Sequence, residues 1–343
     1  MLDNEKEDSS LPEDYNIREK TELPFPKWWP LLAGALSGVM LRLVFSGDPG
    51  GPYATMMASF IYLSPLIVGA TTVYFAERVY RRSWKYYFFA PFLANIFYVI
   101  GTLIIMVEGL ICAVVIVPLF AVFGAIGGLL MGAVCRRTNW PKNTLYSAAL
   151  LPLISGGFEN HEDMSTRVGV VHKEIEIGAP PERIWSEIIE VKDIKKEEVE
   201  NAWIFRIGAP LPKSGILIKT PTGLVRRITM GKQVYFDQVF TEWENHRYLN
   251  SIYKIYEDSI PPGALDDHVM VGGHYFDITG TSYEITPGVS ATKLKIRMEY
   301  RVTTQFNWYA EPVIRFLLNN LEKSLLEFYR HRSEMANKVE SLY

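Results

Sequence analysis

The sequence has little cysteine and none of the short motifs that carry metal or nucleotide chemistry. Its two cysteines, Cys112 and Cys135, fall at the ends of one apolar run, so neither a disulfide framework nor a thiolate metal cluster can be built. Metal-ligand spacings such as HExxH, Gly-rich phosphate loops and GxSxG turns are all absent. We therefore expect no metal and no cofactor. The net charge of −3, without a basic block, argues against nucleic acid as a partner.

Charge is scarce between residues 28 and 156, where only 11 of 129 side chains carry a formal charge. A helix that spans a bilayer needs about 20 apolar residues. Four stretches of this region are long enough: Trp28–Phe45, Tyr53–Ala76, Tyr87–Val107 and Leu110–Val134. We predict a four-helix transmembrane domain over residues 28–135. It follows a polar, acidic tail, residues 1–27, that lacks the pattern of a cleavable signal peptide.

A fifth apolar run, Leu145–Ile154, is only ten residues long and contains Pro152. Its length is about half of what a membrane span requires. We therefore predict that residues 136–167 form an interfacial segment and a linker. The polar, soluble half of the chain begins after this linker.

Lysine and arginine are distributed unevenly among the loops of the membrane domain. The connections around Asp48 and Glu108 contain neither residue, whereas the loop after the second stretch and the segment after the fourth are cationic. Cationic loops resist translocation, so we expect the cationic side to be cytoplasmic. The sequence thus predicts an integral protein of a bacterial inner membrane, with both termini and the C-terminal domain on the cytoplasmic side. The cations are Arg78, Arg81, Arg82, Lys85, Arg136, Arg137 and Lys142.

Small residues recur at intervals of four in the first and fourth predicted spans. They are Gly34 and Gly38 in the first and Gly124, Gly128 and Gly132 in the fourth. Glycines at this spacing let helix backbones approach closely in lipid. We expect them to pack helices within the bundle, and the same faces could bind a protein partner or a second copy of the chain. Arg42 and Glu108 are interpreted as residues at the membrane boundary.

The C-terminal half changes from continuous apolar runs to alternation, which is typical of half-buried strands. A strand at Val170–Ile177 is followed by a proline break and a short helix that opens at Pro181. Several consecutive strands without intervening helices indicate an antiparallel sheet. The final segment, Trp308–Lys338, carries apolar residues at three- and four-residue steps and predicts a long amphipathic helix. The further strands are expected at Ile216–Lys219, Leu224–Met230, Gln233–Trp243, Tyr248–Glu257, Gly273–Thr286 and Thr292–Thr303.

These features carry a resemblance to a known superfamily. The run Glu174–Trp185 with its Gly-Ala-Pro-Pro break, the series of strands and the closing helix resemble the START-like superfamily, also called SRPBCC or polyketide cyclase/dehydrase-like proteins. The similarity covers residues 168–338. Tyr300-Arg301 followed by Trp308-Tyr309 looks like an uncharacterised, membrane-anchored branch of that superfamily.

The resemblance implies an α+β helix-grip fold, in which an antiparallel sheet wraps around the long C-terminal helix and leaves a cavity for an apolar ligand. The aromatic residues and one histidine that are expected to line such a cavity are Trp185, Tyr235, Phe236, Tyr253, His274, Phe276, Tyr300, Trp308, Tyr309 and Phe316. For any one of them, packing in the core is an equally simple interpretation. The adjacent cations Arg226 and Arg227 are interpreted either as a contact for anionic lipid headgroups or as a solvated strand face.

Three functions stay open at this point. The favoured one is a membrane-anchored domain that binds a lipid or another apolar small molecule near the bilayer. The second is a membrane-bound cyclase, dehydratase or hydrolase, for which Asp237 and His274 are the candidate acid or base. The third is a sensor or scaffold in which ligand binding is coupled to the helix bundle through residues 145–166.

Overall fold

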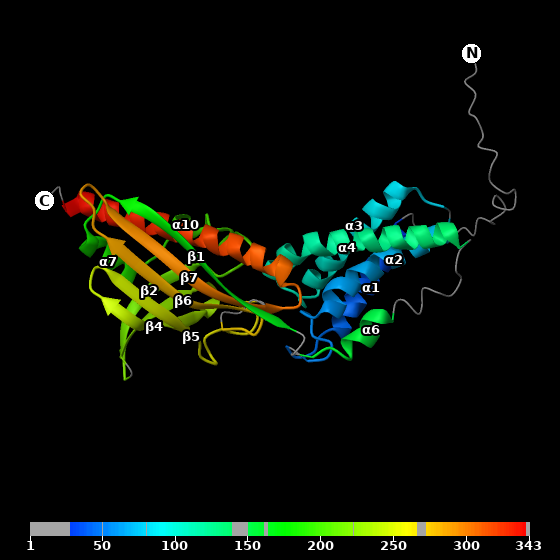
Figure 1. Ribbon diagram of the computed structural model, residues 1–343, viewed down its shortest axis with the longest axis horizontal. Coiled ribbons are helices and arrows are strands. Elements are labelled where there is room, and N and C mark those ends of the chain that lie inside the picture. Colours follow the sequence, from blue (N-terminus) through cyan, green and yellow to red (C-terminus); the bar gives the residue numbers. More distant parts are fainter. Residues whose placement is uncertain are drawn as a thin grey trace, which may run out of the picture.

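The fold was determined from a computed structural model, which describes residues 28–49, 51–79, 81–138, 150–160, 164–221, 223–265 and 272–340. The molecule is elongated, with a helix bundle at one end and a sheet around a long helix at the other (Figure 1). The acidic tail, most of the 136–149 segment and the last three residues lie outside the described parts.

The bundle consists of four antiparallel helices: α1 (Trp29–Val44), α2 (Ser64–Glu77), α3 (Trp84–Ile104) and α4 (Leu110–Arg137). A π-helical turn, η2 (Ser59–Leu63), leads directly into α2. Within the described residues, three helices are long and apolar enough to cross a membrane, namely Ser59–Glu77, α3 and α4.

The prediction of four spanning helices is therefore wrong in its number. Helix α1 is apolar, but it has only 16 residues, or about 24 Å at 1.5 Å per residue, and falls short of the hydrocarbon thickness. The apolar run that starts at Trp28 ends at Phe45, where the backbone leaves the helical conformation. The helix still packs along α2 and α3 as part of the bundle.

All five predicted glycines face other helices of the same chain. A Cβ on Gly34 would lie 2.0 Å from Thr72 Oγ1, and one on Gly38 would lie 2.5 Å from the ring of Tyr98. Gly124 packs on Asn95, and both Gly128 and Gly132 pack on Tyr87. These faces are thus occupied inside the bundle. A protein partner stays a prediction, and it would need another surface.

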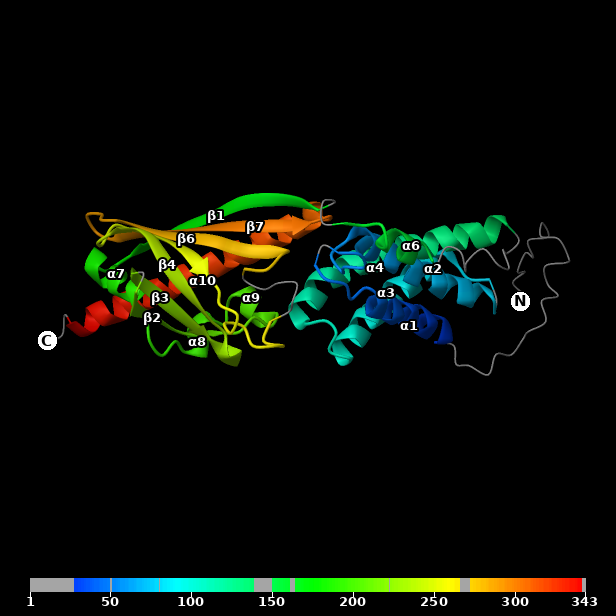
Figure 2. The same ribbon diagram turned by 90° about the horizontal axis from the view of Figure 1, so that it is seen from below.

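The C-terminal half forms one antiparallel sheet of seven strands in the order β1-β7-β6-β5-β4-β3-β2. Helix α10 (Asn307–Glu340) lies along its concave face, as Figures 1 and 2 show. This arrangement is that of a helix-grip fold, as the sequence predicts. The strands are β1 (Ser165–Ile177), β2 (Pro212–Thr220), β3 (Gly223–Met230), β4 (Tyr235–Glu244), β5 (Tyr248–Lys254), β6 (Phe276–Thr286) and β7 (Thr292–Thr304).

Short helices fill the connections and the far end of the sheet. Helix α7 (Pro181–Ile189) opens at Pro181 as predicted and buries Ile184 and Ile188 in the core. Helices α8 (Lys196–Val199) and α9 (Trp203–Arg206) lie between α7 and β2 in the chain and contact α10. Helix α6 (Leu151–Gly156) is the described part of the fifth apolar run.

The sheet domain contacts the end of the bundle whose loops contain no Lys or Arg. Gly208, just after α9, lies against Leu110 at the start of α4, and Glu159 accepts a hydrogen bond from the backbone of Ser59. The cationic residues 78–85 and 136–137 lie at the opposite end, where α2 and α4 finish. Gly156 accepts a hydrogen bond from the backbone of Tyr53 at the end where the sheet domain lies.

This placement separates two features that the sequence predicts to lie on the same side, namely the cationic loops and the C-terminal domain. The prediction assumed that the domain stays on the side where α4 ends. In the structure the cationic residues and the sheet domain lie at opposite ends of the bundle (Figure 2). If the bundle crosses a membrane, cytoplasmic cations and a cytoplasmic sheet domain are mutually exclusive.

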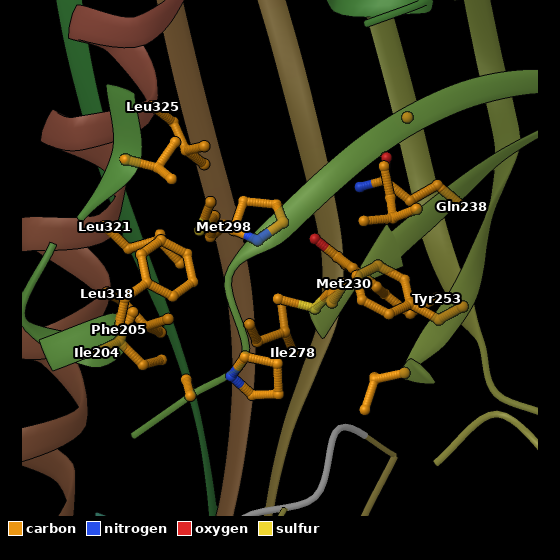
Figure 3. A pocket seen from close by; sticks show the side chains of 18 of the residues that line it. Ile204, Phe205, Met230, Gln238, Tyr253, Ile278, Met298, Leu318, Leu321 and Leu325 are labelled. Carbon is orange, nitrogen blue, oxygen red and sulfur yellow. The ribbon is translucent and has the colours of Figure 1, made fainter. Parts of the chain in front are cut away.

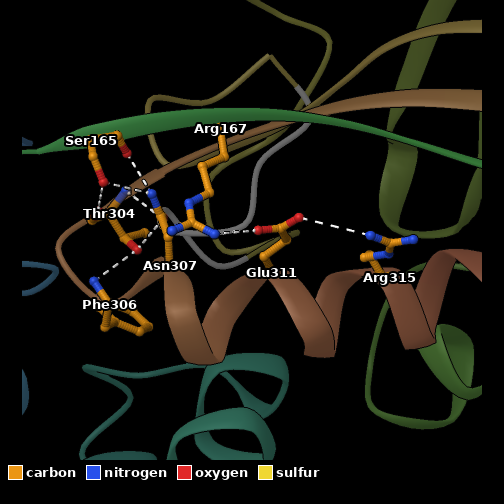
Figure 4. Close-up of polar contacts among 7 residues, drawn as sticks. All are labelled: Ser165, Arg167, Thr304, Phe306, Asn307, Glu311 and Arg315. Carbon is orange, nitrogen blue, oxygen red and sulfur yellow. Dashed lines mark hydrogen bonds and ion pairs between the residues drawn. The ribbon is translucent and has the colours of Figure 1, made fainter.

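A polar network fixes the start of α10 at the junction (Figure 4). Asn307 donates to the carbonyl oxygen of Ser165 at 2.6 Å and accepts from the backbone and the hydroxyl of Thr304. One turn later, Glu311 pairs with Arg167 of β1 at 3.0 Å. The first turn of α10 is thereby tied to both strands that lie beneath it.

The carboxyl group of Glu322 is buried between α10 and the sheet, away from solvent. Glu322 is fully buried, and the backbone of Met298 of β7 and the charge of Lys173 offset only part of the solvation that its carboxyl loses. Burial raises the pKa of this carboxyl from 4.5 to about 7. The neutral acid is thus the form that the folded domain favours.

We expect this group to weaken the fold as the pH rises. Between pH 4.5 and 7 the unfolded chain releases a proton that the folded chain keeps, so the free energy of unfolding falls by at most about 1.4 kcal/mol per pH unit. The substitution Glu322→Gln should remove this dependence and raise the melting temperature above pH 7. Thermal unfolding of both proteins at pH 5 and pH 8 measures the effect. An equal change in both proteins would contradict it.

Candidate functional site

A cavity of about 210 Å³ lies between α10, the sheet and the α8–α9 segment. Leu318, Leu321 and Leu325 of α10 form one wall, and Met230, Ile278 and Met298 of the strands form the other (Figure 3). An apolar cavity of about 150 Å³ stays dry and takes up benzene. The present one can therefore hold a larger apolar molecule.

The polar groups of the cavity wall are few, and most of them come from the sheet. They include Arg226 of β3, Gln238 of β4, Tyr253 of β5 and Tyr283 of β6, whereas Tyr329 lines the cavity from α10. Burial raises the pKa of the Tyr283 hydroxyl well above its usual value, so this group stays neutral. The described lining contains no carboxyl and no imidazole. The wall is thus apolar, with a small set of hydrogen-bonding groups at one place.

A second pocket, the interface pocket, lies where the sheet domain meets the bundle and measures about 120 Å³. Arg42 and Glu108 of the bundle line it and form an ion pair. Four residues line both spaces, namely Ile111 of α4, Phe276 of β6 and Ile314 and Leu317 of α10. The cavity therefore shares a wall with a pocket that the helix bundle helps to build.

Three of the ten predicted ligand contacts lie on the cavity wall. Phe236, Tyr253 and Phe276 belong to β4, β5 and β6, and their side chains face α10. The Tyr253 hydroxyl lies 2.7 Å from Thr281 Oγ1. The structure brings these three together, and their role in binding stays a prediction.

The other seven predicted contacts lie elsewhere. Trp185 packs edge-on against Trp243, with ring centroids 5.3 Å apart, and Tyr300 is buried against Gly169 of the neighbouring strand. Tyr235 stacks on Tyr256 on the outer face of the sheet. Both His274 and Phe316 are exposed, Phe316 to 58%.

The remaining two, Trp308 and Tyr309, hold the junction with the bundle. The indole nitrogen of Trp308 donates to the hydroxyl of Tyr62 at 2.7 Å, and the Tyr309 hydroxyl donates to the carbonyl oxygen of Val115 at 2.6 Å. They face the membrane helices because α10 begins beside η2 and α4. The aromatic pair is therefore part of the docking contact.

Neither candidate acid or base of the enzyme hypothesis reaches the cavity. Asp237 lies between Phe236 and Gln238, which face inward, so the alternation of the strand places it on the outer face. Arg227 donates two hydrogen bonds to it, at 2.7 and 2.9 Å, and Tyr256 donates a third at 2.8 Å. The guanidinium holds the pKa of the Asp237 carboxyl below its usual value. His274 contributes only its carbonyl oxygen, to Arg301.

Two parts of the site were not predicted from the sequence. Arg226 and Arg227 were interpreted together as exposed cations, but neighbouring strand residues point to opposite faces, and Arg226 is the one that points inward. This alternation could have predicted that only one of the two arginines faces the cavity. The contribution of Ile111 from α4 had no signal in the sequence, because it depends on how the two halves meet.

The comparisons with known proteins concern the sheet domain. No family model matches the chain, and no curated protein matches it. Among solved structures, it is similar to a START superfamily protein from Mycobacterium smegmatis, at 16% identity and a TM-score of 0.34, over 49% of this chain and 98% of the other. It is also similar to a truncated norcoclaurine synthase from Thalictrum flavum, at 16% identity and a TM-score of 0.28, over 50% and 95%.

A third similar structure is the di-domain ARO/CYC BexL of the BE-7585A biosynthetic pathway. The identity is 13% and the TM-score is 0.31, over 61% of each chain. These neighbours are START-like proteins, and the first two cover only about half of this chain. The site is therefore described from the geometry of this chain alone.

We expect Asp237→Asn to affect stability but not ligand binding. The ion pair with Arg227 lies outside the cavity, and its loss should cost about 2 kcal/mol near neutral pH. Because the pKa of Asp237 is lowered from 3.8, the stabilisation is present above that pH and disappears as the pH falls through the folded-state value. Melting curves at pH 7 and pH 3 measure this. If a folded Asp237→Asn protein lost ligand binding, Asp237 would have to contribute to the site after all.

Proposed function

We propose that the chain is a membrane-anchored, START-like protein that binds a lipid or another apolar small molecule between the sheet and α10. The observation that carries this proposal is the apolar cavity, which adjoins the interface pocket along Ile111, Phe276, Ile314 and Leu317. A molecule that leaves the bilayer would reach the cavity without crossing bulk water. Extraction and holding of the ligand require no covalent chemistry.

Exposed apolar side chains around the junction support this route. Leu110 and Val114 of α4 are about half exposed, and Phe316 of α10 and Trp203 of α9 are similarly exposed. Apolar residues that are exposed together near a binding pocket mark a surface that is normally covered. Because this surface lies next to helices that could span a membrane, we infer that lipid covers it.

The anchor also implies an orientation. The cationic end of the bundle would face the cytoplasm of a bacterial cell, in keeping with the distribution of Lys and Arg. The sheet domain docks at the opposite end, so this proposal puts it on the outer side of the inner membrane, in place of the cytoplasmic side that the sequence alone predicts. Tethering there would keep the cavity at high effective concentration near the outer leaflet.

The enzyme hypothesis finds no support in the site, because its two named residues lie outside the cavity. The sensor hypothesis has one supporting observation, which is that a ligand in the interface pocket would contact α4 and α10 together. Part of the segment through which the sequence predicts coupling, residues 145–166, lies outside the described residues.

The first prediction tests occupancy. Native mass spectrometry of the full chain, purified from membranes, should show a bound apolar molecule. The substitution Leu321→Trp fills the cavity from α10 and should remove this molecule, because a packed cavity leaves no room for it. The matched control is Phe316→Trp, which enlarges an exposed residue of the same helix. A variant that is folded and keeps the molecule, or a wild-type protein that never carries one, would contradict the proposal.

The second prediction tests orientation. In a chain without Cys112 and Cys135, Val289→Cys places a thiol in the fully exposed turn between β6 and β7, and Lys85→Cys places one at the cationic end. A membrane-impermeant maleimide should label residue 289 in spheroplasts and residue 85 only after the membrane is opened. The reverse pattern would put the sheet domain in the cytoplasm.

A further inference from the structure

One strongly charged group lies in the cavity without a counterion. Arg226 is 5% exposed, and it forms no ion pair with a carboxylate among the described residues. One terminal nitrogen donates to the carbonyl oxygen of Ile188, and the other donates to the hydroxyl of Tyr329 at 3.3 Å. Its Nε–H has no partner within the described parts of the chain. A guanidinium keeps its charge at every physiological pH, so the cavity holds a net positive charge.

Such an arrangement is costly unless something else compensates it. A buried charge without an opposite charge destabilises the fold by several kcal/mol. The contact with Ile188 offsets part of this cost, because the last turn of α7 carries the negative end of the helix dipole. The three hydroxyls around Arg226, from Tyr253, Tyr283 and Tyr329, are neutral hydrogen-bonding groups. No described group supplies the missing negative charge.

Arg226 forms part of the cavity wall. Its Nε packs against Gly215, where a Cβ would come within 2.9 Å of it, and is buried there. The absence of a side chain at Gly215 thus lets the guanidinium lie against the backbone of β2. Gln238, which pairs with Arg226 across the strands, lines the same wall.

We propose that Arg226 binds the acidic group of the ligand, so that the molecule is an anionic amphiphile of the carboxylate class. The proposal rests on the proposed function and narrows the ligand class. A carboxylate in the cavity would accept charge-assisted hydrogen bonds from the guanidinium. It would also neutralise the buried charge, which neutral apolar molecules cannot do.

The geometry also gives the direction of the ligand. Arg226 bonds to Tyr329, whereas the junction with the interface pocket is at Ile314. These residues of α10 are 15 positions apart, or roughly 22 Å along the helix axis. The acidic group thus lies at the end far from the bundle, and the apolar part extends along Leu325, Leu321 and Leu317 toward the membrane helices.

The test compares an acid with its matching alcohol. Isothermal titration of the full chain in lipid nanodiscs, with empty nanodiscs subtracted, measures the affinity for decanoate and for decan-1-ol. The wild-type protein should bind decanoate at least about tenfold more tightly, as expected for one charge-assisted hydrogen-bonded pair. In Arg226→Met the ratio should fall to about one, while binding of decan-1-ol persists. Arg227→Gln, which removes the adjacent guanidinium from the outer face, should keep the wild-type ratio.

Each outcome decides one of the two proposals. Equal binding of both probes by the wild-type protein would overturn the role of Arg226 and leave the apolar site in place; this comparison needs no variant to fold. A folded Arg226→Met protein that still prefers decanoate would overturn it as well. Binding of neither probe, in a protein that melts cooperatively, would count against the proposed function itself.

Discussion

The contact between the first turns of α10 and the membrane helices is the constraint on which the rest of the structure depends. Val302, Phe306 and Ala310 of the sheet domain share one apolar cluster with Phe60 and other residues of the bundle. The hydrogen bonds of Trp308 and Tyr309 fix the direction in which α10 leaves this cluster. Because the sheet wraps around α10, the same contact also decides which end of the cavity faces the bundle. If a flexible linker alone joined the sheet domain to the bundle, neither end of the cavity would have a fixed position relative to the bundle.

The cavity combines two requirements that oppose each other. Apolar walls favour an apolar ligand, but they also lower the local dielectric and strengthen the field of any charge that is left there. Arg226 is tolerated because a helix end and a tyrosine hydroxyl receive two of its donors. In the proposed binding mode, Arg226 would hold the acidic end of an amphiphile, and its apolar end would lie toward the junction.

Periodicity in the sequence predicts most of the fold. The alternation of apolar and polar residues predicts the strands, and apolar residues at three- and four-residue spacing predict α10. The long apolar runs predict α2, α3 and α4. The site is harder to predict, because residue type does not determine which way a side chain points. Tyr235 and Phe236 are adjacent on one strand, so only one can face the cavity, and composition does not say which. Trp308 and Tyr309 are aromatic like the residues of the cavity, but both form hydrogen bonds with the helix bundle instead, and Trp308 is 56% exposed. The position of the domain depends on the chain's return between Arg137 and Gly156, which no local pattern reveals.

The Arg42–Glu108 pair explains how the bundle can present an apolar pocket at the end where its helices terminate. Helix ends leave carbonyl groups unpaired, and Arg42 donates to those of Phe45 and Val107, at the ends of α1 and of the α3–α4 turn. Its charge is balanced by Glu108 in the same turn. Removal of either partner would leave an unpaired charge and open carbonyls beside Ile111. The ion pair therefore leaves the bundle surface under the sheet domain without a net charge and with these carbonyl groups hydrogen-bonded. An apolar ligand that followed the proposed path from the bilayer would need such a surface.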